Sequence, residues 1–111
     1  MLKTFHNDEF KIELSIEDSY NICKDIFLSD NWNIVENSPI KLSFKEKISL
    51  GKCPFFVELF LVKESINSTK IKIQVSVIGK GPYVKKILNN LTKDFIYRLN
   101  NKKDGKKVNY S

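Results

Sequence analysis

The hydrophobic period of the chain changes abruptly near residue 80. Within residues 40–78, apolar residues alternate with polar ones, as in strands whose two faces meet different environments. From Val84 to Leu99 the apolar residues instead recur every three or four positions, which predicts one long amphipathic helix. Gly79 and Gly81–Pro82 separate the two patterns, and proline suits the first turn of a helix. A long helix with one apolar face needs a sheet to pack against.

Four strands are predicted ahead of that helix. They are a short one at Asn33–Val35, then Ile40–Ile48, Phe55–Lys63 and Thr69–Ile78. In Phe55–Lys63 both parities are apolar, so this strand is either covered on both faces or presents an apolar patch to a partner.

A strand and a shorter helix are predicted before these four strands. Apolar and polar residues alternate from Phe10 to Ile16. Ser15 and Asp18 then form a helix N-terminal cap. We expect this helix to end near residues 29–31 and Trp32 to pack back under it.

The order strand, helix, four strands, long helix predicts a two-layer α+β domain over residues 1–100. The sheet should be antiparallel, with the long C-terminal helix packed across one face. Residues 101–111 are rich in lysine and asparagine, and we expect them to form a disordered tail.

This order of elements resembles the START-like helix-grip superfamily, which contains lipid carriers, pollen-allergen-like proteins and polyketide cyclases. The resemblance covers residues 3–100 and rests on Asp30–Asn31–Trp32 after the first helix and Gly79-x-Gly81–Pro82 before the last. It implies a groove or cavity between the long helix and the sheet, and a small one, because the superfamily normally places more strands between its helices. The reduced sheet also resembles the TATA-box-binding-protein-like fold. No catalytic residue is implied, since no matching motif is present.

The implied groove supplies one set of candidate site residues. Its apolar members are either simply core or, if the packing leaves a void, the lining of a pocket for a small apolar molecule. One carboxylate shares their parity and would lie at the groove rim, unless a strand end or a β-bulge turns it outward. The set is Phe44, Glu46, Leu59, Ile73, Leu88, Leu91 and Phe95.

The opposite parity of the strands supplies a second set. Lysines around exposed aromatic rings suit single-stranded nucleic acid, through stacking and phosphate neutralisation. A solvated face with lysine stems over the rings and a surface for a homodimer are the alternative interpretations. The set is Lys41, Lys45, Lys47, Phe56, Phe60, Lys70 and Lys72.

Charge is concentrated near the C-terminus. Lys and Arg number 19 against 13 Asp and Glu, and residues 80–111 alone hold nine basic and two acidic groups. A basic end of this kind is typical of nucleic-acid or anionic-membrane binding. However, the chain has no alanine and only one arginine, Arg98, which indicates a low-GC genome with AT-rich codons. Since bidentate phosphate recognition favours arginine, nucleic-acid binding is only the alternative hypothesis.

Residues able to support catalysis or metal binding are few. His6 is the only histidine and is expected to be solvated, while Cys23 and Cys53 lie thirty residues apart without a CxxC motif. This pattern predicts reduced thiols and no metal or cofactor. No apolar run suits a membrane span or a signal peptide, so a cytoplasmic location is expected.

The sequence therefore predicts a non-enzymatic domain that binds a small apolar molecule or a protein partner through the groove between the C-terminal helix and the sheet. Nucleic-acid binding through the lysine-rich face and the basic tail is the alternative.

Overall fold

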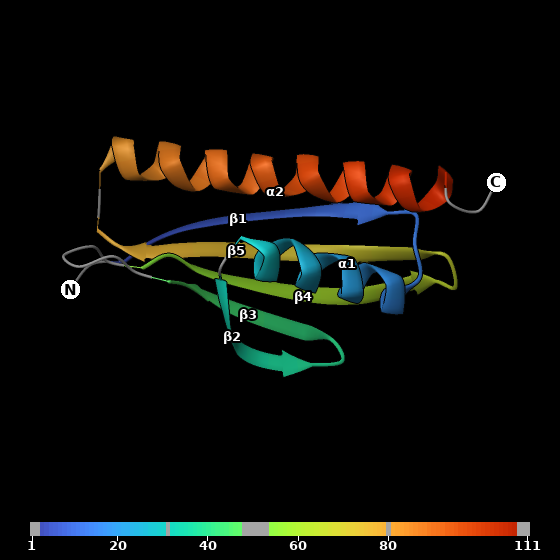
Figure 1. Ribbon diagram of the computed structural model, residues 1–111. Coiled ribbons are helices and arrows are strands. Elements are labelled where there is room, and N and C mark those ends of the chain that lie inside the picture. Colours follow the sequence, from blue (N-terminus) through green and yellow to red (C-terminus); the bar gives the residue numbers. More distant parts are fainter. Residues whose placement is uncertain (1–2, 31, 48–53, 80, 109–111) are drawn as a thin grey trace.

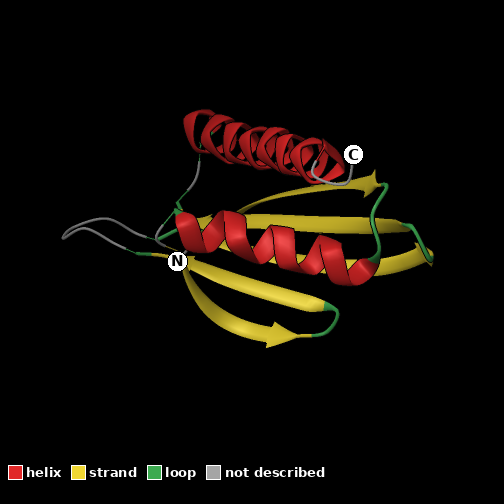
Figure 2. Ribbon diagram, turned by 45° about the vertical axis from the view of Figure 1, so that its right-hand side comes forward, coloured by secondary structure: helices red, strands yellow, loops and turns green. Residues whose placement is uncertain are grey.

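Both helices pack on the same face of an antiparallel sheet (Figures 1 and 2). The computed structural model describes residues 3–30, 32–47, 54–79 and 81–108. The sheet has the spatial order β1-β5-β4-β3-β2, and every neighbouring pair is antiparallel. The predicted α+β class and order of elements are thereby confirmed. The elements are β1 (Lys3–Ile12), α1 (Ile16–Ser29), β2 (Trp32–Ser38), β3 (Lys41–Glu46), β4 (Phe56–Ser65), β5 (Ser68–Ile78) and α2 (Pro82–Val108).

The two helices divide the covered face between them. Helix α2 lies over β1 and β5, while α1 packs beside it over β5, β4 and β2. Helix α1 begins as predicted, because the Ser15 hydroxyl accepts a hydrogen bond from the Asp18 backbone N–H at 3.2 Å. At its other end, Asp30 accepts two hydrogen bonds from Arg98 of α2, one of them 2.9 Å long. This ion pair ties the end of α1 to α2.

Aromatic side chains join the layers in the core. The Phe27 ring of α1 stacks on Phe44 of β3 at 4.5 Å between centroids and lies 5.0 Å from Phe95 of α2. Trp32 meets Phe27 edge-on at 5.2 Å, as its predicted position under the helix requires. Phe10 of β1 approaches Phe95 at 6.2 Å. These five rings connect both helices to three strands, so the core lies between the helices and the sheet.

Strand β1 is longer at its start than the alternation indicated. It begins at Lys3 and pairs with β5 without interruption from Lys3↔Ile78 to Ile12↔Thr69. Its first inward positions hold polar residues, including Thr4 and His6, so hydrophobic alternation did not reveal them. The predicted strand also ran to Ile16, which instead begins α1.

Two further boundaries differ from the prediction. Strand β2 spans seven residues, and a bulge between Ile34 and Glu36 breaks its alternation. Helix α2 continues to Val108, so residues 101–108, predicted to be disordered, are helical. Lysine and asparagine do not stop a helix, and the single Gly105 costs only about 1 kcal/mol. Residues 109–111, Ile48 and the connection at 50–53 lie outside the described residues.

Candidate functional site

The apolar groove candidates all lie between the helices and the sheet. Phe44, Leu59 and Leu88 are fully buried, and Ile73 and Phe95 are nearly so. Leu91 is half-buried at the edge of the same cluster. The inward residues of β3, β4 and β5 and the apolar stripe of α2 therefore form one core, as predicted. Phe27 of α1 also belongs to this core, which the sequence did not show.

Glu46 lies at the edge of this core. It is half-buried and pairs with the buried Trp32 across β2 and β3, so it stands on the inward parity. Its backbone N–H donates a hydrogen bond to the Phe55 carbonyl at 3.0 Å. The irregularity that could have turned Glu46 outward falls in β2 rather than β3.

The sequence predicted that the His6 side chain is solvated, but it is half-buried. It lies on the inward side of β1, opposite Val75 of β5. Its Nε2 atom is buried and has no hydrogen-bond partner within the part of the chain that the structure describes. A buried polar atom without a partner costs about 1–3 kcal/mol, so a bound polar group would relieve it.

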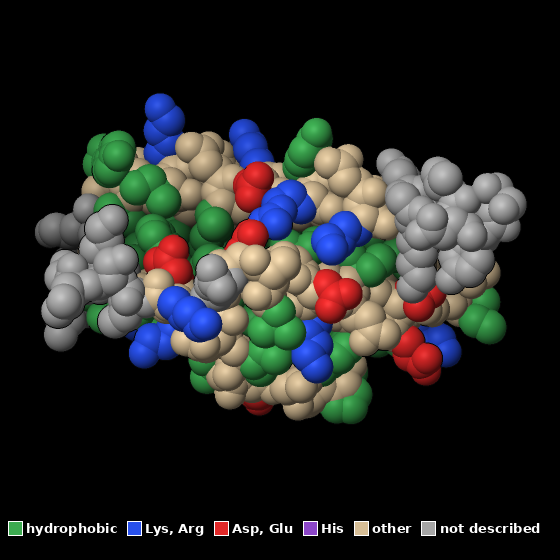
Figure 3. Space-filling view, viewed as in Figure 1, with side chains coloured by type: hydrophobic (Ala, Val, Ile, Leu, Met, Phe, Trp, Pro, Cys, Tyr) green, Lys and Arg blue, Asp and Glu red, His purple; other side chains and the backbone are tan. Residues whose placement is uncertain are grey.

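A hollow of about 450 Å³ lies between the first turns of α1 and the β2–β3 turn. Ile40, predicted to point inward from a strand, instead lies in this turn and is 59% exposed. Hydrophobic surface between α1 and the β2–β3 hairpin is visible in Figure 3. The lining residues are Ile16, Glu17, Tyr20, Asn21, Pro39 and Ile40.

The sequence reasoning missed this hollow. Alternation and helical spacing show which side of an element is apolar, but not where α1 lies across the sheet. The available signal was Pro39–Ile40, an apolar pair at a turn, together with Ile16 and Tyr20 four residues apart on α1.

The second candidate set lies on the uncovered face of the sheet, called here the outer face. Lys45 pairs with Phe56 across β3 and β4, Lys41 pairs with Phe60, and Lys72 pairs with Phe60 across β4 and β5. Lys70 shares this face, whereas Lys47 follows the end of β3 and is exposed. The predicted neighbours are thus brought together. Phe60 is 38% exposed, so this strand presents an apolar patch.

Most lysines on the outer face already have partners. Lys41 Nζ lies 2.9 Å from Glu36 and 3.9 Å from Glu58, and 5.2 Å from the Phe60 ring centroid. Its hydrogen bond to Glu36 and the negative charges of Glu36 and Glu58 raise the pKa of Lys41. Lysines held by acidic neighbours are poorly placed to neutralise phosphates, so the outer face gives the nucleic-acid hypothesis no support.

Lys70 and Lys45 also have partners, acidic side chains for Lys70 and an aromatic ring for Lys45. Lys70 lies 4.0 Å from Glu9 and 3.8 Å from Glu64, and Lys45 lies 5.8 Å from the Phe56 ring centroid. Basic and acidic side chains are also interspersed on the helical side of the molecule (Figure 3). Among the residues that the structure describes, neither face shows the one-sided basic patch typical of nucleic-acid binding.

Cys23 is a free, buried thiol, while Cys53 lies outside the described residues. Burial raises the pKa of Cys23 to about 12. Near pH 8, where an ordinary thiol of pKa about 8.5 is partly ionised, Cys23 should stay neutral. We expect iodoacetamide to leave the Cys23 peptide unmodified in the native protein and to modify it in urea, as read by peptide mass. Rapid labelling of native Cys23 would contradict this burial.

The residues that the structure describes contain no group of three or more His, Cys, Asp or Glu side chains placed to hold a metal ion. Within the same ranges, neither helix combines the length and apolar character needed to cross a membrane.

No protein-family profile and no curated protein sequence matches the chain. An uncharacterised protein from Bacillus thuringiensis has a similar structure, with a TM-score of 0.67, 5% identity and coverage of 86% of this chain and 96% of that one. The di-domain ARO/CYC BexL from the BE-7585A biosynthetic pathway gives 0.64 at 10% identity over 89% of this chain. The match covers only 45% of BexL, so this chain spans less than half of its length.

A START superfamily protein from Mycobacterium smegmatis gives a TM-score of 0.51 at 16% identity, over 86% of this chain and 92% of that one. Identities this low show the fold alone. The fold is START-like and helix-grip, as the sequence resemblance implied.

Proposed function

We propose that this protein is a small-molecule-binding domain and that it takes up its ligand in the hollow between α1 and the β2–β3 turn. The observation that carries the proposal is the hollow itself, which is open to solvent and has a volume of about 450 Å³. Its apolar walls come from Ile16, Tyr20, Pro39 and Ile40. Small-molecule sites usually measure about 300–1,000 Å³ and combine apolar walls with a few polar groups.

The polar groups in the hollow suggest the chemistry of the ligand. Glu17 and Asn21 stand one turn apart on α1, and Tyr20 adds a hydroxyl beside its apolar ring. A carboxylate and an amide together accept hydrogen bonds from an amine. We therefore infer a compact molecule with an apolar body and an amine or other donor at one end, bound without chemical conversion. The START-like fold supports a binding role by analogy.

The groove beneath α2 is the second candidate location for the same activity. His6 presents there a buried Nε2 atom that has no hydrogen-bond partner among the described residues, and Val84 and Leu91 of α2 are only half-buried. Figure 3 shows hydrophobic surface beneath the N-terminal half of α2. A ligand in this groove would place its polar group against His6 and its apolar part against α2.

N-phenyl-1-naphthylamine is a suitable probe, because it is neutral and apolar, carries one N–H donor and fluoresces when it leaves water. Ile40→Asp should weaken its binding at least ~tenfold, since a charge replaces one apolar wall of the hollow. Ile66→Asp is the matched control, because Ile66 is also an isoleucine in an exposed turn, 75% exposed, but does not line the hollow. Titration of probe fluorescence with each protein gives the affinities.

The proposal predicts saturable binding to the wild type and to Ile66→Asp, with a clear loss in Ile40→Asp. Equal binding by both variants would exclude the hollow as the site. If Leu91→Asp then weakened the probe while Ile40→Asp did not, the groove beneath α2 would be the site instead.

A further inference from the structure

The outer face of the sheet is arranged in rows that cross the strands. One row reads Glu9, Lys72, Phe60, Lys41 from β1 through β5 and β4 to β3. This row is complementary to its own reverse, because an acid stands at one end, a lysine at the other, and a lysine and an aromatic ring stand between them.

A second row shows the same property. It reads Phe5, Ser76, Phe56, Lys45 over the same four strands. When the row is reversed, Phe5 faces Lys45 and Ser76 faces Phe56, so neither pair combines like charges. Phe5 is 49% exposed.

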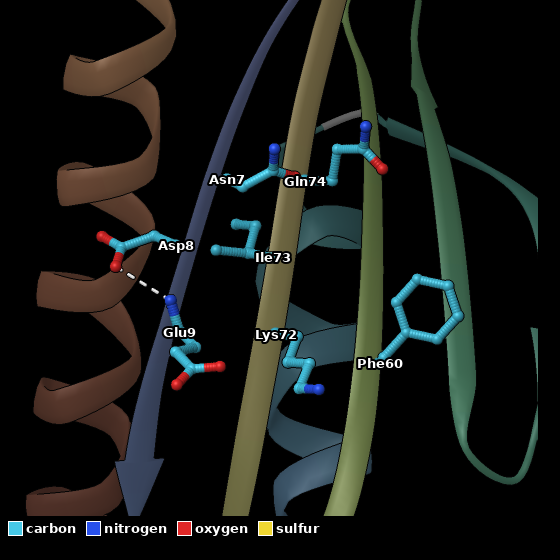
Figure 4. A pocket seen from close by; sticks show the side chains of 7 residues that line it. All are labelled: Asn7, Asp8, Glu9, Phe60, Lys72, Ile73 and Gln74. Carbon is cyan, nitrogen blue, oxygen red and sulfur yellow. Dashed lines mark hydrogen bonds between the residues drawn. The ribbon is translucent and has the colours of Figure 1, made fainter.

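A shallow cleft of about 500 Å³ lies along the first row and the neighbouring Asn7↔Gln74 pair (Figure 4). Its floor is Lys72 and Gln74 of β5, with Phe60 of β4 on one side and Asn7 and Glu9 of β1 on the other. Lys72 is exposed and, unlike Lys41, has neither an acidic partner nor an aromatic ring beside its ammonium among the described residues. The cleft thus contains a cation without a partner next to an exposed ring.

We propose that the outer face binds a second copy of this chain, forming a symmetric dimer with the two sheets face to face. A two-fold axis parallel to the strands, between β4 and β5, sets Glu9 opposite the partner's Lys41 and Lys72 opposite the partner's Phe60. The partner's Phe60 ring then enters the cleft and supplies the aromatic face that Lys72 lacks. Such an interface is isologous, as a two-fold axis requires.

The size of the face agrees with this interface. The four strands that face the partner, β1, β5, β4 and β3, have ten, eleven, ten and six residues. At about 3.3 Å per residue and about 4.8 Å between strands, this surface measures about 600 Å². Standard interfaces bury about 600–1,000 Å² per partner. The helices lie on the opposite face, so this dimer leaves the hollow at α1 accessible and is independent of ligand binding.

Light scattering after gel filtration, at high micromolar concentration and moderate salt, tests the proposal. The wild type should have twice the chain mass of 12.9 kDa. Phe60→Lys should be monomeric, because it removes the aromatic ring and sets an ammonium group against the partner's Lys72 at the centre of the interface. Ile66→Asp and Ile40→Asp should stay dimeric, and circular dichroism should show that all variants are folded.

A crosslinking experiment tests the orientation without relying on any single variant's stability. Glu9→Cys with Lys41→Cys, in a Cys53→Ser background, should form a covalent dimer with a short bismaleimide, because facing sheets stand about 10 Å apart, beyond the reach of a disulfide. Within one chain these residues stand three strand spacings apart, about 14 Å, and the mass of the product separates a dimer from a monomer crosslinked within itself. Each single cysteine variant should stay uncrosslinked.

A monomeric wild type would overturn the proposal. A wild-type dimer that survives Phe60→Lys, or that gives no crosslink with the cysteine pair, would place the interface elsewhere and overturn it equally.

Discussion

Replacing Phe44 with alanine should lower the free energy of unfolding by about 3–5 kcal/mol. Phe44 is fully buried, and its ring stacks on Phe27 at 4.5 Å, which links β3 to α1. The substitution removes this contact and leaves a cavity beneath α1. Because small domains are stable by only about 5–15 kcal/mol, urea unfolding followed by circular dichroism should show a large shift of the midpoint.

Phe60→Ala is the matched control for this prediction. Phe60 is also a sheet phenylalanine, but it lies on the outer face and is 38% exposed. At low protein concentration, where the proposed dimer dissociates, its loss should cost less than about 1 kcal/mol. Equal effects of the two variants would mean that the core does not lie on the helix-covered face.

Leu88→Lys should remove the cooperative unfolding transition. Leu88 is fully buried on the face of α2 that meets the sheet. The lysine side chain would lack both water and a counterion there, whether its amine is charged or neutral. The free energy of unfolding should therefore fall by more than about 4 kcal/mol. Far-UV circular dichroism during thermal unfolding measures this directly.

Asn90→Lys, an exposed position two residues further along α2, should unfold like the wild type. The comparison also bears on function, because a loss of ligand binding in Leu88→Lys would report unfolding rather than a lost contact. A folded, cooperatively melting Leu88→Lys protein would show that α2 is not seated on the sheet as described.

The sequence was sufficient for the parts of the fold that depend on local hydrophobic pattern. Alternation in β3, β4 and β5 and the stripe of α2 correctly identified the inward residues, because each apolar side chain follows its own element's period. The start of β1 was missed because Thr4 and His6 occupy inward positions there. Pairing with β5, a long-range interaction, determines that segment instead.

The candidate sites were harder to predict for the same reason. The outer-face lysines were placed correctly, yet their acidic partners Glu36, Glu58 and Glu9 come from three different strands. Only the strand register brings these charges together. The hollow at α1 likewise depends on the lateral position of a helix, which no local pattern encodes.

The most direct measurement of the proposed function is a titration of the ¹⁵N-labelled protein with N-phenyl-1-naphthylamine, followed by amide chemical shifts. Our account predicts shifts concentrated at residues 16–21 of α1 and at the β2–β3 turn around Ile40. Shifts confined to β1 and α2 would move the site to the groove beside His6. An unchanged spectrum at probe saturation would contradict the proposed binding function.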